Sequence, residues 1–196
     1  MNSVEAVYDG NQQLLLLTTL TKSSPMMGAI FLLGVASGLR VSDLLTLNKS
    51  DLARTIHITE SKTKKPKIIH LTKDQHDYLV QYAKTIPHGK SLFPTSRTTV
   101  YRHFNRVGAI LGLQTPLGTH TMRKTYLWNV FLHSKGCIET VRLAANHKYT
   151  STTITYLRGG ITMLVKRYAR KAKKGITPSV PHTTCTKRHK KTNFEI

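Results

Sequence analysis

Apolar positions in the first quarter of the chain predict two consecutive helices. Residues 26–35 are apolar nearly all round, which is typical of a buried helix, and Gly38 breaks the run. A second helix is predicted over residues 41–47, with Ser42 as its N-cap residue. Arg40 therefore lies in the short connection between the two helices.

A β-hairpin is predicted next. Residues 55–59 and 67–71 are short strand-like runs joined by a polar turn. Lys64 and Lys65 lie in this turn, so the tip of the hairpin is basic. A surface helix is predicted over residues 73–86.

Another amphipathic helix is predicted around residues 100–111. Its polar face carries basic side chains, namely Arg97, Arg102, His103 and Arg106. Such a face can follow DNA phosphates or enter a major groove, although a solvated charged face fits the pattern equally well. Further helices are predicted over residues 120–134, over 138–145, and from a capping run at 150–153 onward.

Length and composition favour a single domain. A chain of 196 residues with 39% hydrophobic residues can bury a sizeable core. We expect a mainly α-helical domain with a small antiparallel β-sheet, an α+β fold, over residues 1–175. Residues 176–196 are basic and lack periodicity, which predicts a disordered tail.

The charge of the chain indicates a polyanionic partner. It has 30 Lys and Arg against 9 Asp and Glu, a formal net charge of +21. Cations that bind nucleic-acid phosphates release counterions and relieve this self-repulsion. No apolar run approaches the roughly 20 residues that span a bilayer, so we expect no membrane partner.

Five short motifs carry candidate chemistry. They are Gly38-Leu-Arg-Val-Ser-Asp-Leu-Leu45, Ser61-Lys-Thr63, His120-Thr-Met-Arg123, Asn146-His147 and Tyr156. Their order and spacing resemble the catalytic domain of the tyrosine recombinases, the phage integrase family, in its short single-domain type. The resemblance covers residues 26–170, and its most specific parts are the H-x-x-R pair and the nine-residue separation of the last histidine from the tyrosine.

The resemblance implies a role for each matching residue. Arg40 and Arg123 would bind the non-bridging oxygens of the scissile phosphate, and Tyr156 would attack the phosphorus to form a 3′-phosphotyrosyl link. Lys62 would protonate the departing 5′ oxygen.

Three more residues would assist them. His120 would act as a base or hydrogen-bonding partner, His147 would complete the phosphate pocket, and Asp43 would support the site. Family members usually carry Leu-Gly before the last histidine, where this chain has Ala145 and Asn146.

The residue types suit this chemistry without the resemblance. Planar, permanently charged arginines can neutralise a phosphodiester as its pentacoordinate state develops. A phenol loses its proton near pH 10, so a nucleophilic tyrosine needs a nearby histidine or a cationic pocket. Exchange of one phosphodiester for another conserves the energy of the bond, so we expect no ATP. Because arginines can neutralise the phosphodiester without a metal, we expect no metal and no other cofactor.

The resemblance also implies partners. We expect double-stranded DNA as the substrate, a homo-oligomer that forms a tetrameric synapse on DNA, and accessory DNA-bending proteins. About 25 residues precede the first matching helix, too few for the separate DNA-binding domain of most integrases. DNA affinity would then come from other cations, among them Lys64, Lys65, Arg97, Arg102 and Arg106. The expected location is the cytoplasm of a prokaryotic host, in association with the nucleoid.

Two alternatives stay open. A non-catalytic DNA-binding or regulatory protein with the same fold would explain the charge, but it would not need a tyrosine framed by histidines. A metal-dependent nuclease is the other, because Asp51 and the segment Glu60-Ser-Lys62 imitate an acid-acid-x-Lys arrangement that holds Mg²⁺.

Overall fold

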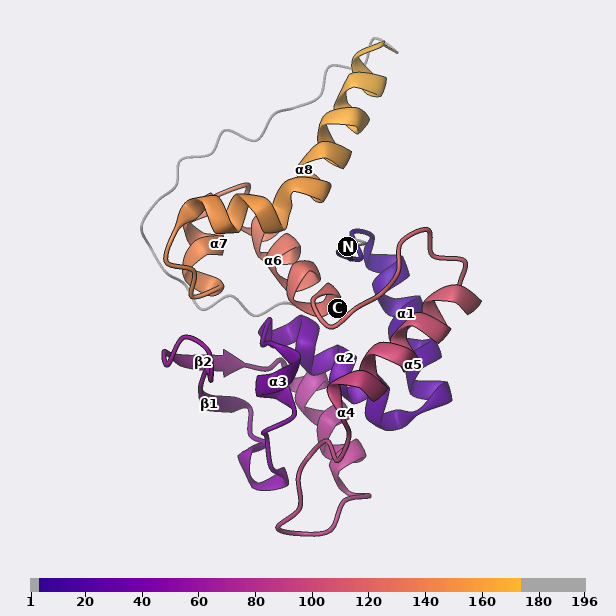
Figure 1. Cartoon of the computed structure of the whole chain (residues 1–196), viewed down its shortest axis with the longest axis vertical. Coiled ribbons are helices and arrows are strands. Elements are labelled where there is room, and N and C mark those ends of the chain that lie inside the picture. The colour runs from indigo at the N-terminus through magenta and orange to yellow at the C-terminus, as the bar shows by residue number, and fades with distance from the viewer. Residues whose placement is uncertain (1–3, 174–196) are drawn as a thin grey trace. The chain divides into compact units, whose positions relative to one another are not determined.

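The structure of the chain, a computed structural model, describes residues 4–173 (Figure 1). These residues form two compact units, one within Met1–Tyr126 and the other within Leu127–Lys190. The division falls inside helix α6 (Thr121–His133). The tail predicted over residues 176–196 lies outside the described residues.

Helices and one two-stranded antiparallel sheet make up the first unit. Its elements are α1 (Gly10–Ser23), α2 (Pro25–Ser37), α3 (Val41–Leu44), the 3-10 helix η1 (Lys49–Asp51), β1 (Thr55–Thr59), β2 (Pro66–His70), α4 (Lys73–Ala83), α5 (Arg97–Ile110) and the first residues of α6. The second unit contains the rest of α6, α7 (Ile138–Ala144) and α8 (Thr150–Lys173). The expected mainly helical fold with a small antiparallel sheet is confirmed.

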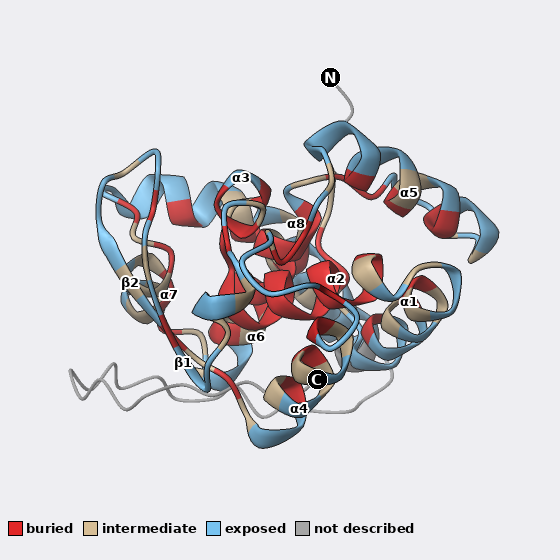
Figure 2. Ribbon diagram, turned by 90° about the horizontal axis from the view of Figure 1, so that it is seen from below, coloured by how far each residue is buried: buried red, intermediate tan, exposed pale blue. Residues whose placement is uncertain are grey.

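Helix α2 lies in the core of the first unit. Eleven of its 13 residues are buried, and they are coloured red in Figure 2. Helices α1, α4 and α5 pack against it, and Phe31 of α2 meets Phe104 of α5 edge to face with 6.0 Å between ring centroids. The prediction of a buried helix is therefore confirmed. Gly38 ends α2 in the left-handed conformation, with φ of 63°.

The hairpin forms with the predicted order of strands. Strand β1 has the predicted bounds, and β2 begins one residue earlier than predicted. In the register of the sheet, Ile56 pairs with Ile69 and Ile58 pairs with Lys67. Because side chains alternate along a strand, Lys67 shares a face with the buried Ile69.

Helix α1 is not among the predicted elements. Its buried residues, Gln13, Leu16 and Leu20, have helical spacing, and the Asp9 carboxylate caps it by accepting the N–H of Gln12. The four consecutive leucines at 14–17 hide that spacing in the sequence, because two of them are exposed.

The predicted N-cap of α3 is wrong. The backbone N–H groups of Asp43 and Leu44 donate to the carbonyl of Arg40 at 2.9 and 3.0 Å, so Arg40 occupies the N-cap position and Ser42 lies inside the helix. This short helix therefore begins directly at the residue whose side chain is a candidate phosphate ligand. Among residues 4–173, no helix combines the length and apolar composition needed to cross a bilayer.

Candidate active site

The carboxylate of Glu60 joins the two candidate arginines of the first unit. Its Oε1 lies 3.3 Å from Nη1 of Arg123, and its Oε2 lies 3.4 Å from Nη1 of Arg40. Glu60 is fully buried and the Arg123 side chain is 1% exposed, whereas the Arg40 side chain is 18% exposed. The chain therefore holds two guanidinium groups together at one point, with one of them open to solvent.

Opposing effects determine the charge of Glu60. Burial raises the pKa of this carboxyl group, but the hydrogen bond from the Thr63 hydroxyl, at 2.7 Å, and the charges of three nearby cations lower it. The net result is a pKa below its ordinary value, so Glu60 is ionised at neutral pH. The three cations are Arg123, Lys67 and Arg40.

The end of α2 positions both arginines. The carbonyl of Gly38 accepts a hydrogen bond from Nη1 of Arg123 at 2.8 Å, and Arg40 follows two residues later. A side chain at position 38 would collide with the ring of Tyr126, which lies on α6 next to this turn. Glycine is thus suited to this position for two reasons, the left-handed backbone and the close approach of the Tyr126 ring.

Asp43 connects α3 with the hairpin turn. Its Oδ1 accepts hydrogen bonds from the backbone N–H and the hydroxyl of Ser61, and its Oδ2 lies 3.9 Å from Nη1 of Arg40. Asp43 is buried, so these contacts fix the start of the turn that carries Lys62. Lys62 itself is exposed.

Lys67 is a member of this site that the motif comparison did not identify. Its Nζ lies over the ring of Tyr126, 4.9 Å from the centroid. Burial, followed by the charge of Arg123, lowers the pKa of Lys67 to about 7, against the opposing effect of Glu60. The alternation of the strand could have revealed it, since Lys67 and the apolar Ile69 are two residues apart.

His120 precedes α6 and is a weak base in this setting. Its partial burial, then the positive charges of Arg123, Arg40, Lys124 and Lys62, lower its pKa below the ordinary histidine value. The imidazole is therefore neutral at neutral pH and can accept a proton.

His147 and Tyr156 lie together in the second unit. Their ring centroids are 5.1 Å apart with planes tilted by 51°. Nδ1 of the buried His147 and the hydroxyl of Thr153 form a hydrogen bond of 3.0 Å. Arg142 contacts the backbone of the same residue, because its Nη1 donates a hydrogen bond to the carbonyl of His147 at 2.8 Å. The histidine is thus fixed beside the half-buried tyrosine.

Asn146 replaces the usual glycine without loss of the turn. It adopts a left-handed backbone, with φ of 55°, and the next N–H, of His147, donates to the carbonyl of Arg142 at 3.0 Å. Asparagine tolerates this conformation better than most residues. The departure from the family pattern is therefore a substitution between two residues suited to one backbone shape.

The candidate catalytic residues are divided between the units. Those of the first unit are Arg40, Lys62, His120 and Arg123, and those of the second are His147 and Tyr156. Within each unit the candidates are close in space or coupled by charge, which sequence order alone does not require.

Helix α5 has the predicted two faces. Val100, Phe104 and Val107 are buried. The candidate DNA-binding cations of this helix and of the hairpin turn are all exposed, namely Lys64, Lys65, Arg97, Arg102 and Arg106. His103 is engaged differently, since its Nε2 lies 2.8 Å from the hydroxyl of Ser23 on α1.

The carboxylates of the nuclease alternative have other partners. Asp51 accepts the backbone N–H of Asn48 at 2.8 Å as part of the cap of η1, while Glu60 binds the arginines. Within residues 4–173, no group of three or more His, Cys, Asp and Glu side chains is arranged to hold a metal ion.

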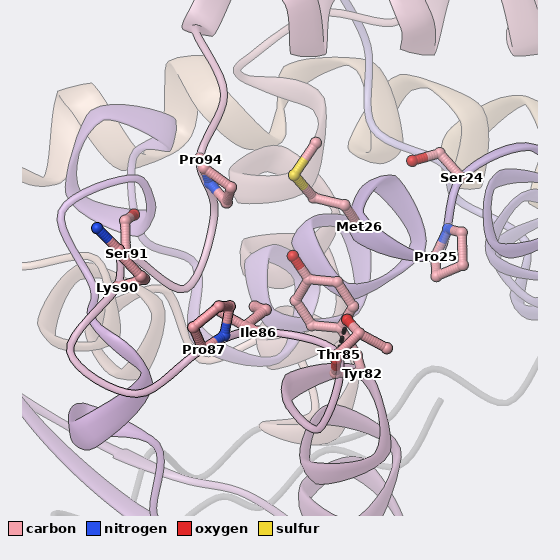
Figure 3. Close-up of a pocket in the computed structure, with 10 residues that line it drawn as sticks. All are labelled: Ser24, Pro25, Met26, Tyr82, Thr85, Ile86, Pro87, Lys90, Ser91 and Pro94. Atoms are coloured by element: carbon pink, nitrogen blue, oxygen red, sulfur yellow. Dashed lines mark hydrogen bonds between the residues drawn. The ribbon is translucent and has the colours of Figure 1, made fainter.

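A cavity of about 580 Å³ opens elsewhere in the first unit (Figure 3). Its lining includes Met26, Tyr82, Ile86 and three prolines, so it is mainly apolar. None of the candidate catalytic residues lines it.

Comparison with known proteins gives consistent matches. The phage integrase family matches residues 7–160. YoeC of Bacillus subtilis (strain 168), a probable integrase/recombinase, is 34% identical over 137 residues, which cover 65% of this chain and 75% of that protein.

Solved structures share the fold at lower identity. The crystal structure of XerA recombinase matches with a TM-score of 0.66 and 21% identity over 86% of this chain and 66% of that one. A lambda integrase tetramer bound to a Holliday junction matches with a TM-score of 0.61 and 22% identity over 80% and 49%. The chain therefore spans only part of the length of these solved proteins.

Proposed function

This chain belongs to the phage integrase family, and we propose that it is a site-specific tyrosine recombinase that cleaves and rejoins DNA through a covalent bond between Tyr156 and a 3′ phosphate. The observation that carries the proposal is the meeting of Arg40 and Arg123 at Glu60. Two guanidinium groups held at one point suit the two non-bridging oxygens of one phosphodiester. The family match, over residues 7–160, includes every candidate catalytic residue.

Phosphate binding would begin at the exposed guanidinium. Arg40 would meet the DNA phosphate first, because Arg123 is buried. Both arginines would then stabilise the additional negative charge of the pentacoordinate state, which is the interaction that accelerates the reaction. Glu60 and Asp43 would hold them in place without a metal ion.

Cleavage would break one phosphorus–oxygen bond and form another. The phenol oxygen of Tyr156 would attack the phosphorus, and the neutral His120 would accept the phenol proton. Lys62 would give a proton to the departing 5′ oxygen. His147, fixed by Thr153, would donate a hydrogen bond to the phosphate.

Rejoining would be the reverse reaction. A 5′ hydroxyl from another strand would attack the phosphotyrosyl ester and lose its proton to the neutral lysine. His120 would return its proton to the departing oxygen of Tyr156, which leaves as a phenol. The number of phosphoester bonds stays constant, so the cycle needs no external energy source.

DNA would be held by several copies of the chain. The lambda integrase match is a tetramer bound to a Holliday junction, and we infer a homo-oligomer on paired DNA sites for this chain by analogy. The exposed cations of α5 and the hairpin turn would contact the DNA backbone. We further propose that accessory DNA-bending proteins assist the synapse, in the cytoplasm of a prokaryotic host and on nucleoid DNA.

A covalent adduct tests the function directly. The protein is incubated in chelator with nicked duplexes from the DNA that flanks its gene, and the products are separated on a denaturing gel. The wild type should form a protein–DNA adduct, and Tyr156→Phe should form none. Tyr149→Phe is the matched control, because this exposed tyrosine lies only two residues after His147 and should be dispensable.

Two results would contradict the proposal. An adduct formed by Tyr156→Phe would assign the nucleophile to another residue. Absence of an adduct from wild type, although both proteins retard the same duplex on a native gel, would favour a DNA-binding protein without catalysis.

A further inference from the structure

Lys67 is a cation on the inward face of the hairpin. The register places it opposite Ile58 and on the same face as Ile69, which is buried. A charged group on such a face is costly unless opposite charges or hydrogen bonds compensate it. Lys67 therefore needs a specific electrostatic environment, which the exposed Lys62 does not.

Charged groups from three parts of the first unit surround it. Those that act on Lys67 are Arg123 from α6, Glu60 after β1, and Arg40 and Asp43 at α3. The ring of Tyr126, also on α6, lies against Nζ at 4.9 Å. Lys67 is thus part of the same cluster as the two candidate phosphate-binding arginines.

The charges of this cluster are unbalanced by one unit. With Lys67 protonated, three cations face two carboxylates, and one positive charge remains. With Lys67 neutral, the two arginines and two carboxylates cancel. A bound phosphodiester, which carries one negative charge, is therefore balanced only by the protonated form of Lys67.

We propose that Lys67 is a positioning residue of the phosphate site, which takes up a proton when a DNA phosphodiester binds to Arg40 and Arg123. The proposal rests on the proposed function, because it takes these arginines as the phosphate ligands. The proton stays on Nζ while the phosphate is bound, and no covalent bond changes. DNA binding and proton uptake are consequently linked.

The acid–base properties of the free site agree with this coupling. Burial and the neighbouring arginines lower the pKa of Lys67 to about 7, so half of the molecules carry a neutral lysine at that pH. A phosphate added to the cluster raises this pKa, because an added negative charge favours the cation. DNA binding is then expected to take up a proton above pH 7. At a pH well below 7 it should take up none, because Lys67 is already protonated.

The pH dependence of DNA affinity tests the proposal. Dissociation constants for a fluorescent duplex of gene-flanking DNA are measured at pH 7.5 and 8.5 in the Tyr156→Phe background, in which no cleavage occurs. If binding takes up one proton, each rise of one pH unit above the pKa of free Lys67 weakens DNA binding by up to about tenfold. We expect this loss for the parent protein and for Lys84→Met, which changes an exposed lysine directly after α4.

Two substitutions at position 67 separate the role of the charge from that of the fold. Lys67→Arg keeps a permanent cation, so its affinity should change by less than twofold between the two pH values. Lys67→Met has no titrating group, so its affinity should be weaker at both pH values and equally insensitive. A tenfold pH loss that persists in both variants would overturn the proposal.

A measurement without DNA keeps the test independent of the cleavage experiment. The ¹³Cε resonances of labelled lysines are titrated by NMR, and Lys67 is assigned by its absence from Lys67→Arg. A midpoint near 7 supports the proposal, and a midpoint near 10 overturns it. Failure of the proposed function would show itself differently, as the absence of a wild-type adduct on the same duplex.

Discussion

The backbone carbonyl of Gly38 accepts a hydrogen bond from the guanidinium group of Arg123 at 2.8 Å. One helix terminus thus fixes a buried arginine through its backbone and presents Arg40 two residues later. The contact depends on the left-handed conformation of Gly38, which turns the chain at the end of α2. The geometry of the phosphate site is therefore set by a turn as much as by its charged side chains.

Gly38→Ala should disrupt this turn. A Cβ costs roughly 1–2 kcal/mol in the left-handed region and would also collide with the ring of Tyr126, so we expect a loss of more than about 2 kcal/mol in the free energy of unfolding. Urea denaturation measures it. Gly89→Ala is the matched control, because Gly89 has φ of 72° and open space around it. Equal losses in the two variants would show that the Tyr126 contact is unimportant.

Glu60→Gln should destabilise the first unit in a pH-dependent way. The substitution leaves Arg40 and Arg123 without their shared carboxylate, and loss of one partner of a buried ion pair costs about 3 kcal/mol. The folded state lowers the pKa of Glu60 below 4.5, its value in the unfolded chain. The contribution of Glu60 to stability is therefore fully present above pH 4.5, and it disappears as the pH falls through the lower pKa of the folded state.

Urea denaturation at pH 7 and at pH 3.5 measures this difference. The destabilisation by Glu60→Gln should be smaller at the lower pH. Glu139→Gln serves as the control, because Glu139 is exposed and its surface pair with Arg142 should contribute little to stability. A loss by Glu60→Gln that is small at pH 7 would contradict a structural role for the bridge.

The hydrophobic pattern could predict most of the elements, but neither helix α1 nor this bridge. The buried α2 and the hairpin follow from runs of apolar and alternating residues, whereas Glu60 stands in a polar turn, where a carboxylate is normally solvated. Its burial depends on arginines far away in the sequence. Thr153 is similar, since it stands in a capping run and yet is fully buried against His147.

Motif spacing could identify the candidate catalytic residues but not their supporting contacts. The nine-residue spacing identified His147 and Tyr156, and their ring centroids lie 5.1 Å apart in the structure. Lys67 has no place in those motifs, and the signal for it was the strand alternation with Ile69. Electrostatic partners of this kind depend on three-dimensional proximity, which a single sequence does not display.

Lys67 should make the stability of the free protein depend on pH. Its pKa is about 7 in the folded state and 10.5 in the reference state, so the unfolded chain binds more protons between these values. Stability attributable to this group should therefore rise as the pH increases from 7 towards 10.5. Between pH 7 and 9 we expect a gain of about 2 kcal/mol in the wild type relative to Lys67→Met. Urea denaturation at both pH values measures this gain. If the free energy of unfolding changed equally in the two proteins between pH 7 and 9, the prediction would be wrong.

Thr153→Val should impair cleavage without impairing DNA binding. The substitution keeps the shape of the side chain but removes the hydroxyl that bonds to Nδ1 of His147, so the imidazole loses the contact that fixes its ring beside Tyr156. Loss of a buried hydrogen bond of this kind costs roughly 1–2 kcal/mol, which corresponds to about a tenfold lower rate of adduct formation. Single-turnover cleavage of a nicked duplex measures the rate, and a native gel measures the affinity, which should be unchanged.

Thr155→Val is the matched control on the same helix. Thr155 is exposed, and its hydroxyl donates to the carbonyl of Ser151 at 3.0 Å rather than to a candidate catalytic residue. Its cleavage rate should therefore equal that of the wild type. If Thr153→Val also cleaved at the wild-type rate, the orientation of His147 would not depend on this hydrogen bond. A parallel fall in rate and affinity would instead indicate a general disturbance of α8, because an orienting contact should affect the chemical step alone.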